Sequence, residues 1–228
     1  MDPDIVLALR VVLIYALPVL LAVTLHEAAH GYAARLLGDD TAQRAGRISL
    51  NPLRHIDPVG TVLMPVLLYM GTHGTFTFGY AKPVPVNFSA LRQPKRDMVW
   101  VAFAGPGSNL VQALLWLWFG LGLIALGVQE PFFLLMARAG VLVNLVMFTF
   151  NLFPVPPLDG GRVLVGLLPL RPALAVARLE PMGFFIVVGL LVAGVVDRWW
   201  MHPILRTLQQ WLRQLHPTSF AQLMGLSP

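Results

Sequence analysis

The segment TLHEAAHGY, Thr24–Tyr32, places two histidines and a glutamate at the end of an uncharged apolar run, Val11–Val23. His26 and His30 are four residues apart, so on a helix their imidazoles project from one face. That spacing suits two nitrogen ligands of one Zn²⁺, with Glu27 beside the metal-bound water as general base. Ionisable groups within apolar segments are costly and usually functional. We therefore favour a metal site over polar residues that merely reach the membrane interface at a helix end.

A catalytic zinc site needs a third protein ligand and one open position. The chain has no cysteine, so any metal must bind to nitrogen and oxygen ligands. Asp159 stands out because it follows the helix-breaking prolines of FPVPPLDGGR and precedes two glycines that allow a sharp turn or a close backbone approach. With the histidine pair present, a ligand explains this residue better than an ordinary helix-capping aspartate. The sequence predicts one Zn²⁺ per chain, bound by His26, His30 and Asp159.

Membrane spans must position these residues. Of the 228 residues, 57% are hydrophobic and 12% are charged, and the mean hydropathy is +0.70. A soluble domain usually carries about 25% charged residues. Several stretches approach the roughly 20 apolar residues that cross a bilayer. The net charge of +5 is spread over loops between apolar segments, which indicates phospholipid headgroups and membrane topology and excludes nucleic acid as the expected partner.

We expect an all-α polytopic membrane protein with about four transmembrane helices in one domain, 1–228, whose catalytic core lies within 5–162. The N-terminus lacks a basic region and a cleavage site, so it is predicted to be an uncleaved first span. In the second span, Gly105 to Gly107 together with Asn109 predict close helix packing. Residues 203–215 have the apolar spacing of an amphipathic interfacial helix. The expected spans are 5–37, 97–127, 132–152 and 182–200, the last being additional to a three-helix core.

The region between the first two spans, 38–96, has a different character. Its apolar run, 59–70, is too short and too rich in proline and glycine to span comfortably. The following FTFGYAKPVPVNF, 76–88, alternates and carries prolines, which indicates short strands with an exposed edge. Non-helical backbone at membrane depth survives only when it packs on protein or lines a wet cavity. We therefore expect a re-entrant or membrane-surface β region here.

Basic residues orient the chain. If 59–70 does not cross, residues 38–96 and 153–181 lie on the same side of the membrane. The stretch from Arg35 to Arg96 and the later loop carry eleven Lys and Arg, against four on the other side. The positive-inside rule then places both loops in the cytosol and both termini outside. We expect a multi-pass protein of the cell (inner or cytoplasmic) membrane with its catalytic site toward the cytosolic side.

These motifs together resemble the site-2 protease family of intramembrane zinc metalloproteases. The HExxH pattern alone is moderately specific, but the Asn-x-x-Pro and Leu-Asp-Gly segment after the intervening spans makes the match highly specific. No PDZ or CBS module is found, so the chain resembles a minimal form, which leaves its regulation and its choice of substrate open. The matching segments, in the family's order, are HEAAHGYAARLLGD (26–39), GRISLNPLRHIDPVGT (46–61), FGYAKPVPVN (78–87), AGPGSN (104–109) and NLFPVPPLDGGR (151–162).

The resemblance implies that His26, His30 and Asp159 are zinc ligands and that Glu27 is the base that activates water. It also implies that Asn151 contacts the substrate or the developing oxyanion. The alternative for Asn151 is a polar cap at the end of a helix.

A transmembrane helix hides its scissile carbonyls in its own hydrogen bonds, so cleavage needs a way to hold the substrate unwound. The stretch Thr75–Val86 can do this by adding the substrate as a strand to an exposed edge. Phe78, Val84 and Val86 are then candidate substrate contacts. A membrane-surface scaffold without substrate contact is an equal alternative. His55, in a family motif, is either a substrate or gating residue or a histidine hydrogen-bonded within its turn.

The predicted function is therefore intramembrane proteolysis of single-span membrane proteins within the lipid bilayer, with the oligomeric state left open. A membrane zinc-binding or transport protein is the main alternative, but transporters favour repeated halves, and this chain has no internal repeat. A non-catalytic relative would normally have lost Glu27. A membrane-anchored protease acting on soluble proteins would more often use a glutamate as third ligand.

Overall fold

The computed structural model describes residues 3–63, 67, 70, 82–128 and 130–225. In this part of the chain every regular element is a helix, which confirms the all-α fold class. Three helices are long and apolar enough to cross a membrane. They are α1 (Pro3–Leu36), α4 (Pro94–Ala125) and α5 (Pro131–Asn151), close to the expected first three spans.

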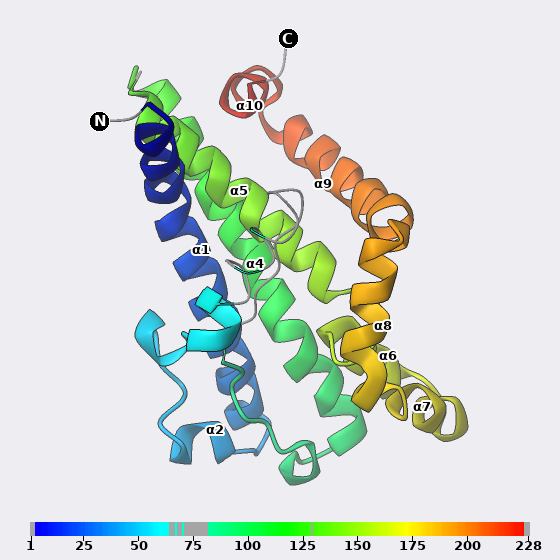
Figure 1. Ribbon diagram of the computed structural model, residues 1–228. Helices are drawn as coiled ribbons and strands as arrows, with labels where there is room; N and C mark the ends of the chain where they lie inside the picture. The colour runs from blue at the N-terminus through cyan, green and yellow to red at the C-terminus, as the bar shows by residue number, and fades with distance from the viewer. Residues whose placement is uncertain (1–2, 64–66, 68–69, 71–81, 129, 226–228) are drawn as a thin grey trace.

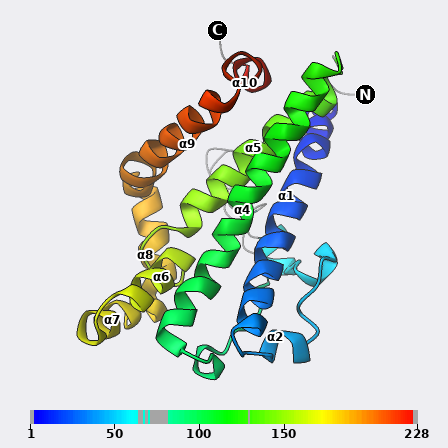
Figure 2. The same ribbon diagram turned by 180° about the vertical axis from the view of Figure 1, so that it is seen from behind.

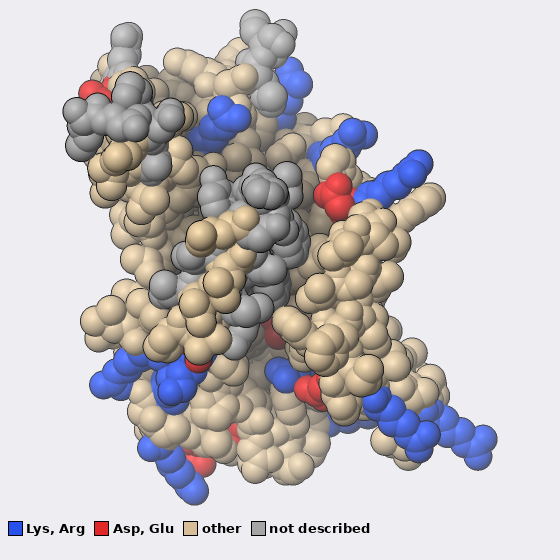
Figure 3. All heavy atoms as spheres, viewed as in Figure 1, with Lys and Arg blue, Asp and Glu red and all other residues tan. Residues whose placement is uncertain are grey.

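The helix α4 packs against both α1 and α5 and runs antiparallel to them (Figures 1 and 2). Both α1 and α5 begin at the end of the molecule where the two termini lie. Small residues allow close contacts: a Cβ at Gly140 on α5 would lie only 2.2 Å from the ring of Trp116 on α4. The indole therefore sits directly on the α5 backbone. On the face shown in Figure 3, Lys and Arg gather toward the two ends of the molecule, as in a protein that spans a membrane.

The connection from α1 to α4 contains only short helical segments in its described part. These are α2 (Thr41–Arg44), η1 (Pro52–Arg54), the π-helical η2 (Pro58–Leu63) and η3 (Phe88–Ala90). None of these described segments is long enough to cross a membrane. The apolar run 59–70 lies partly outside the described residues, so its expected failure to span stays a prediction.

The strands expected in this connection are not found among the described residues. Residues 82–87 run extended without forming a strand, and 75–81 lie outside the described part. Pro83 and Pro85 remove two of the N–H donors that a strand ladder needs. This stretch is instead held by individual side-chain contacts and by one backbone hydrogen bond, from the amide of Lys82 to the carbonyl of His55.

Asp39 ties this extended stretch to the end of α1. Its buried carboxylate accepts hydrogen bonds from the amide and hydroxyl of Thr41 through Oδ1, and from the amide of Asn87 through Oδ2 at 2.7 Å. Burial alone would raise the pKa of Asp39, but the hydrogen bonds from Thr41 and Asn87 outweigh it and hold the pKa below its usual value. The ionised carboxylate is therefore a structural link.

The first three helices after α5 are α6 (Asp159–Leu167), α7 (Leu170–Ala177) and α8 (Glu180–Val192). Asp159 is the first residue of α6, directly after the proline-rich turn. The expected fourth span, 182–200, is not one helix: α8 ends at Val192, and Gly194 adopts a positive φ of 70°. If α7 and α8, bent by 68°, count as one broken span, the described part of the chain has four candidate spans.

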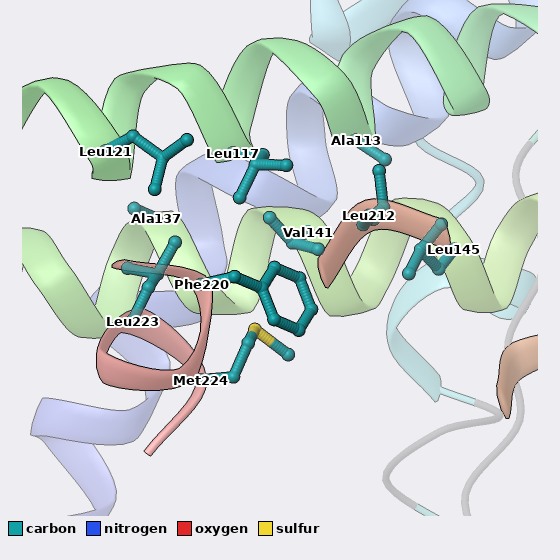
Figure 4. Packing of buried hydrophobic residues seen from close by; sticks show 10 residues of the cluster. All are labelled: Ala113, Leu117, Leu121, Ala137, Val141, Leu145, Leu212, Phe220, Leu223 and Met224. Carbon is teal, nitrogen blue, oxygen red and sulfur yellow. The ribbon is translucent and has the colours of Figure 1, made fainter. Parts of the chain in front are cut away.

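The C-terminal part folds back on the bundle. It comprises the π-helical η4 (Asp197–Met201), α9 (His202–Leu215) and α10 (Pro217–Met224). The tail 203–215 is a helix, as expected, but its apolar side also packs on protein: Leu212 is fully buried. Figure 4 shows Leu212 from α9 and Phe220, Leu223 and Met224 from α10 packed against α4 and α5.

We expect Asp39→Asn to lower the free energy of unfolding at neutral pH by about 1–3 kcal/mol, because hydrogen bonds to a charged acceptor are lost or weakened. Since the folded pKa lies below the unfolded value, this stabilisation is present above the unfolded pKa of about 3.9 and disappears as the pH falls through the folded pKa. Denaturant unfolding in detergent at pH 7 and at acid pH measures both effects.

The matched control is Asp40→Asn, which removes an exposed ion pair with Arg44 at 2.8 Å and is expected to change stability by less than about 1 kcal/mol. Equal losses for the two variants at pH 7 would contradict the structural role of Asp39.

Candidate metal centre

Three donor atoms from two distant parts of the chain converge inside the bundle. The Nε2 atoms of His26 and His30 lie 3.0 Å apart, and Oδ2 of Asp159 lies 3.2 Å and 3.3 Å from them. Three ligands placed 2.0–2.1 Å from one tetrahedral Zn²⁺ are separated by about 3.3 Å. His26 and Asp159 are buried and His30 is half-buried. The spacing therefore fits a single zinc ion.

The hydrogen bonds of the two imidazoles decide where their protons lie. Nδ1 of His26 is 2.7 Å from Oδ1 of Asn109, and Nδ1 of His30 is 2.7 Å from the carbonyl oxygen of Val101. Both partners can only accept, so in the neutral rings Nδ1 carries the hydrogen and Nε2 carries a lone pair.

The carboxylate completes a set of proton-free donors. Oδ2 of Asp159 is buried and has no hydrogen-bond partner in the described part of the chain. Two imidazole lone pairs and this oxygen face one another at about 3 Å, an arrangement that is repulsive unless a cation lies among them. Two nitrogens and one oxygen are a ligand set that Zn²⁺ accepts. The residues present thus fit the metal.

A buried asparagine pair supports the first histidine. Nδ2 of Asn109 donates to Oδ1 of Asn144 at 2.9 Å and to the carbonyl of Ala22 at 3.1 Å, and Nδ2 of Asn144 donates to the carbonyl of Gly140 at 2.9 Å. Both asparagines are fully buried. These bonds set the direction of the Asn109 amide and hence the orientation of His26.

Residue spacing alone did not predict this supporting role: Asn109 was expected only as part of a packing motif, and none of the recognised motifs contains Asn144. The sequence feature that points to a role for Asn109 and Asn144 is an amide side chain within each of two apolar spans, where unpaired polar groups are costly. Nothing in the spacing indicates which partner each amide meets.

Gly105 explains why α4 can approach the histidines so closely. A Cβ at this position would lie 2.3 Å from Nε2 of His30 and 2.7 Å from Cε1 of His26. The expected close packing around the AGPGSN motif is present, and at Gly105 the packing partner is the imidazole pair itself.

The turn between α5 and α6 brings Asp159 to the site. A Cβ at Gly160 would lie 2.1 Å from the carbonyl oxygen of Leu152, and a Cβ at Gly161 would lie 2.1 Å from the nitrogen of Pro156. The start of α6 therefore packs directly on the chain that leaves α5. Only residues without a side chain permit this contact, so the two glycines position the aspartate.

Glu27 lies on α1 between the histidines but outside the three-atom donor set. Its Oε2 accepts a hydrogen bond from the amide of Val84 at 2.7 Å. The Val84 side chain is buried and packs near Gly31 of the same helix. The extended stretch 82–87 thus runs beside α1 at the level of the candidate base.

The remaining predicted site residues lie in different surroundings. Asn151 is the last residue of α5, and its Nδ2 donates to the carbonyl of Met147 at 3.0 Å. Val86 packs in a small cluster with Ala34 and Leu91 at the end of α1. Phe78 lies outside the described residues.

His55 is buried, and it contacts both the preceding loop and the start of the stretch 82–87. Nε2 lies 2.8 Å from the carbonyl of Ser49, and the His55 carbonyl accepts the amide of Lys82 at 2.9 Å. These contacts are the ones required by the alternative in which His55 stabilises its turn. Through Lys82 they also hold the beginning of the extended stretch.

Comparison with known proteins identifies the relatives of the chain. "Putative zinc metalloprotease YwhC" of Bacillus subtilis is 38% identical over 178 residues, which cover 74% of this chain and 75% of the relative. The chain belongs to the site-2 protease-like family of zinc metalloproteases. "Putative zinc metalloprotease Rip2" of Mycolicibacterium smegmatis, another member, is 32% identical over 184 residues, or 79% of this chain and 67% of the relative. No family model matches the chain, and no solved structure does.

We expect Gly105→Ala to reduce zinc affinity by at least about tenfold, because the new methyl group would displace an imidazole from the position that a zinc ligand needs. Zinc content after dialysis against a weak chelator, measured by mass spectrometry, tests this.

Gly107→Ala is the matched control. It adds the same methyl group to the same helix, where the nearest atom is a ring carbon of Phe103 at 3.4 Å. Unchanged zinc content in Gly105→Ala would show that α4 can retreat from the histidines without cost.

Proposed function

We propose that this chain is an intramembrane zinc metalloprotease that hydrolyses peptide bonds in or near transmembrane segments of membrane proteins. The observation that carries the proposal is the convergence of His26, His30 and Asp159 inside a bundle of helices long enough to span a membrane. The zinc metalloprotease relatives support the class of reaction. Buried donors within apolar helices support the location of the reaction in the membrane.

His26, His30 and Asp159 would hold the zinc ion. When bound there, Zn²⁺ supplies Lewis acidity, which polarises the scissile carbonyl and makes water more acidic. The chain's own contribution is to keep both histidines in one tautomer, through Asn109 and the Val101 carbonyl. The apolar helices around the donors limit the entry of other water.

Glu27 is the proposed general base. Its carboxylate would take a proton from the attacking water and pass it to the nitrogen of the leaving amine. The amide of Val84 fixes the direction of the carboxylate by holding Oε2. Oε1 has no hydrogen-bond partner among the described residues, so it is available for the proton.

The extended stretch 82–87 is proposed to hold unwound substrate beside this carboxylate. Arg47 also holds the stretch, since its Nη2 donates to the carbonyl of Lys82 at 2.8 Å. Val84 and Val86 then lie where a substrate strand would pair. Asn151, at the end of α5, is proposed to contact the substrate or the oxyanion.

The proposed orientation follows the charges. The histidines lie within about three turns of Leu36, at the end of α1 that leads into the basic connection to α4. The positive-inside rule assigns this end to the cytosol. We therefore infer that water reaches the site from the cytosolic side, and that single-span proteins of the same membrane are the substrates, as in regulated intramembrane proteolysis.

Glu27→Gln is expected to keep one zinc per chain and to lower the rate of cleavage by about 10²–10⁴-fold, the usual contribution of a general base. Purified protein in detergent, incubated with a panel of single-span substrates, gives the rate, and mass spectrometry gives the zinc. Glu130→Gln is the control, because Glu130 caps α5 at the opposite end of the bundle. Cleavage by Glu27→Gln at the wild-type rate would reject Glu27 as the base.

Asp159→Ala is expected to lose both zinc and cleavage, because the two imidazoles alone leave the metal with one ligand fewer. The exposed Asp197 serves as control, and Asp197→Ala should retain both properties. A full complement of zinc in Asp159→Ala would mean that another residue is the third ligand.

A further inference from the structure

A groove of about 400 Å³ lies between α1 and α5, toward the end of the bundle where both helices begin. Two cations line it: Arg10 from α1 and Arg138 from α5. Apolar side chains form much of the rest of its walls, among them Val11, Ile14, Leu135 and Leu142. The groove is thus largely apolar and carries two positive charges.

The two arginines lie at the same level of the bundle. Arg10 is seven residues from the first residue of α1 (3 to 10), and Arg138 is seven residues from the first residue of α5 (131 to 138). At 1.5 Å per residue, each is about 10 Å along its helix. The uncharged part of α1 starts at Val11. Both guanidinium groups therefore mark the boundary between a membrane interface and the apolar spans.

Neither guanidinium group is neutralised by the described part of the chain. No described residue makes a hydrogen bond or an ion pair with Arg10 or Arg138. Arg138 is half-buried and borders Gly225, just beyond the end of α10, where a Cβ would lie 2.9 Å from its Nη1. The partial negative charge of that helix end offsets only part of one positive charge.

We propose that this groove binds an anionic phospholipid, with its phosphate between Arg10 and Arg138 and its acyl chains along the apolar walls. Guanidinium groups donate paired hydrogen bonds to phosphate oxygens. Positive side chains close to a membrane surface attract anionic lipid head groups. A pair of cations that no described residue compensates, next to an apolar span, is costly without such an anion.

The shape of the groove favours a lipid over a soluble anion or a peptide. A free phosphate would leave the apolar walls next to Val11 and Leu142 without a partner. An acidic peptide would bring backbone amides and carbonyls against those walls, where they find no hydrogen-bond partner. The phosphate of a phospholipid can pair with the two arginines, and its acyl chains can cover the apolar walls. The lipid would also bridge α1, which carries the histidines, to α5.

The test uses the full-length chain in a neutral detergent, titrated with phosphatidylglycerol, with phosphatidylcholine, or with inorganic phosphate. Native mass spectrometry counts retained lipid, and thermal unfolding gives the shift in Tm. We expect phosphatidylglycerol to be retained and to raise the Tm, and Arg10→Gln and Arg138→Gln each to weaken this binding by about tenfold. Arg35→Gln is the matched control, since it removes the same charge from the opposite end of α1.

Several results would overturn the proposal. One is equal retention of phosphatidylglycerol by the wild type and Arg10→Gln, and another is equal loss in Arg35→Gln, which would indicate general surface attraction. An equal Tm shift with inorganic phosphate alone would indicate a soluble-anion site, and one with phosphatidylcholine would indicate an uncharged lipid contact. Because Arg138 borders α10, Arg10→Gln decides the matter if Arg138→Gln does not fold.

Discussion

Two imidazole nitrogens and a carboxylate oxygen face one another without a proton between them, and the rest of the structure depends on this arrangement. Each Nε2 is a free lone pair because the other ring nitrogen donates to an oxygen on α4. A cation removes the mutual repulsion of the three atoms. The helix α4 therefore does more than pack between α1 and α5. Its Asn109 side chain and its Val101 carbonyl determine which tautomer the two histidines adopt.

The close approach of α4 has a consequence for the whole bundle. At Gly105 the helix backbone touches the imidazoles, and at Gly140 the α5 backbone touches Trp116. In a membrane the hydrophobic effect does not drive helices together, so small residues and buried hydrogen bonds must supply the association. The Asn109–Asn144 pair links α4 to α5 at the same depth as the site. Gly105 and the asparagine pair therefore serve both the packing of the helices and the orientation of the histidines.

The non-helical stretch between α1 and α4 is also held by a few specific hydrogen bonds. Residues 82–87 run beside α1 without a strand partner among the described residues, and Glu27, Arg47 and Asp39 each bind one or two of their backbone groups. Prolines explain why no ladder forms, although the alternating pattern favoured strands. The expected fourth span was wrong as one continuous helix because Gly194 has a positive φ that an α-helix cannot contain.

The sequence by itself determined the membrane class, the first three spans and the three candidate ligands. Long apolar runs and the spacing of His26, Glu27 and His30 act locally, so they can be read without knowing the fold. The tertiary structure alone decided which amide orients His26, which backbone touches the imidazoles and which amide holds Glu27. Those contacts join residues far apart in the chain, and their geometry depends on how three helices pack, which no local pattern encodes.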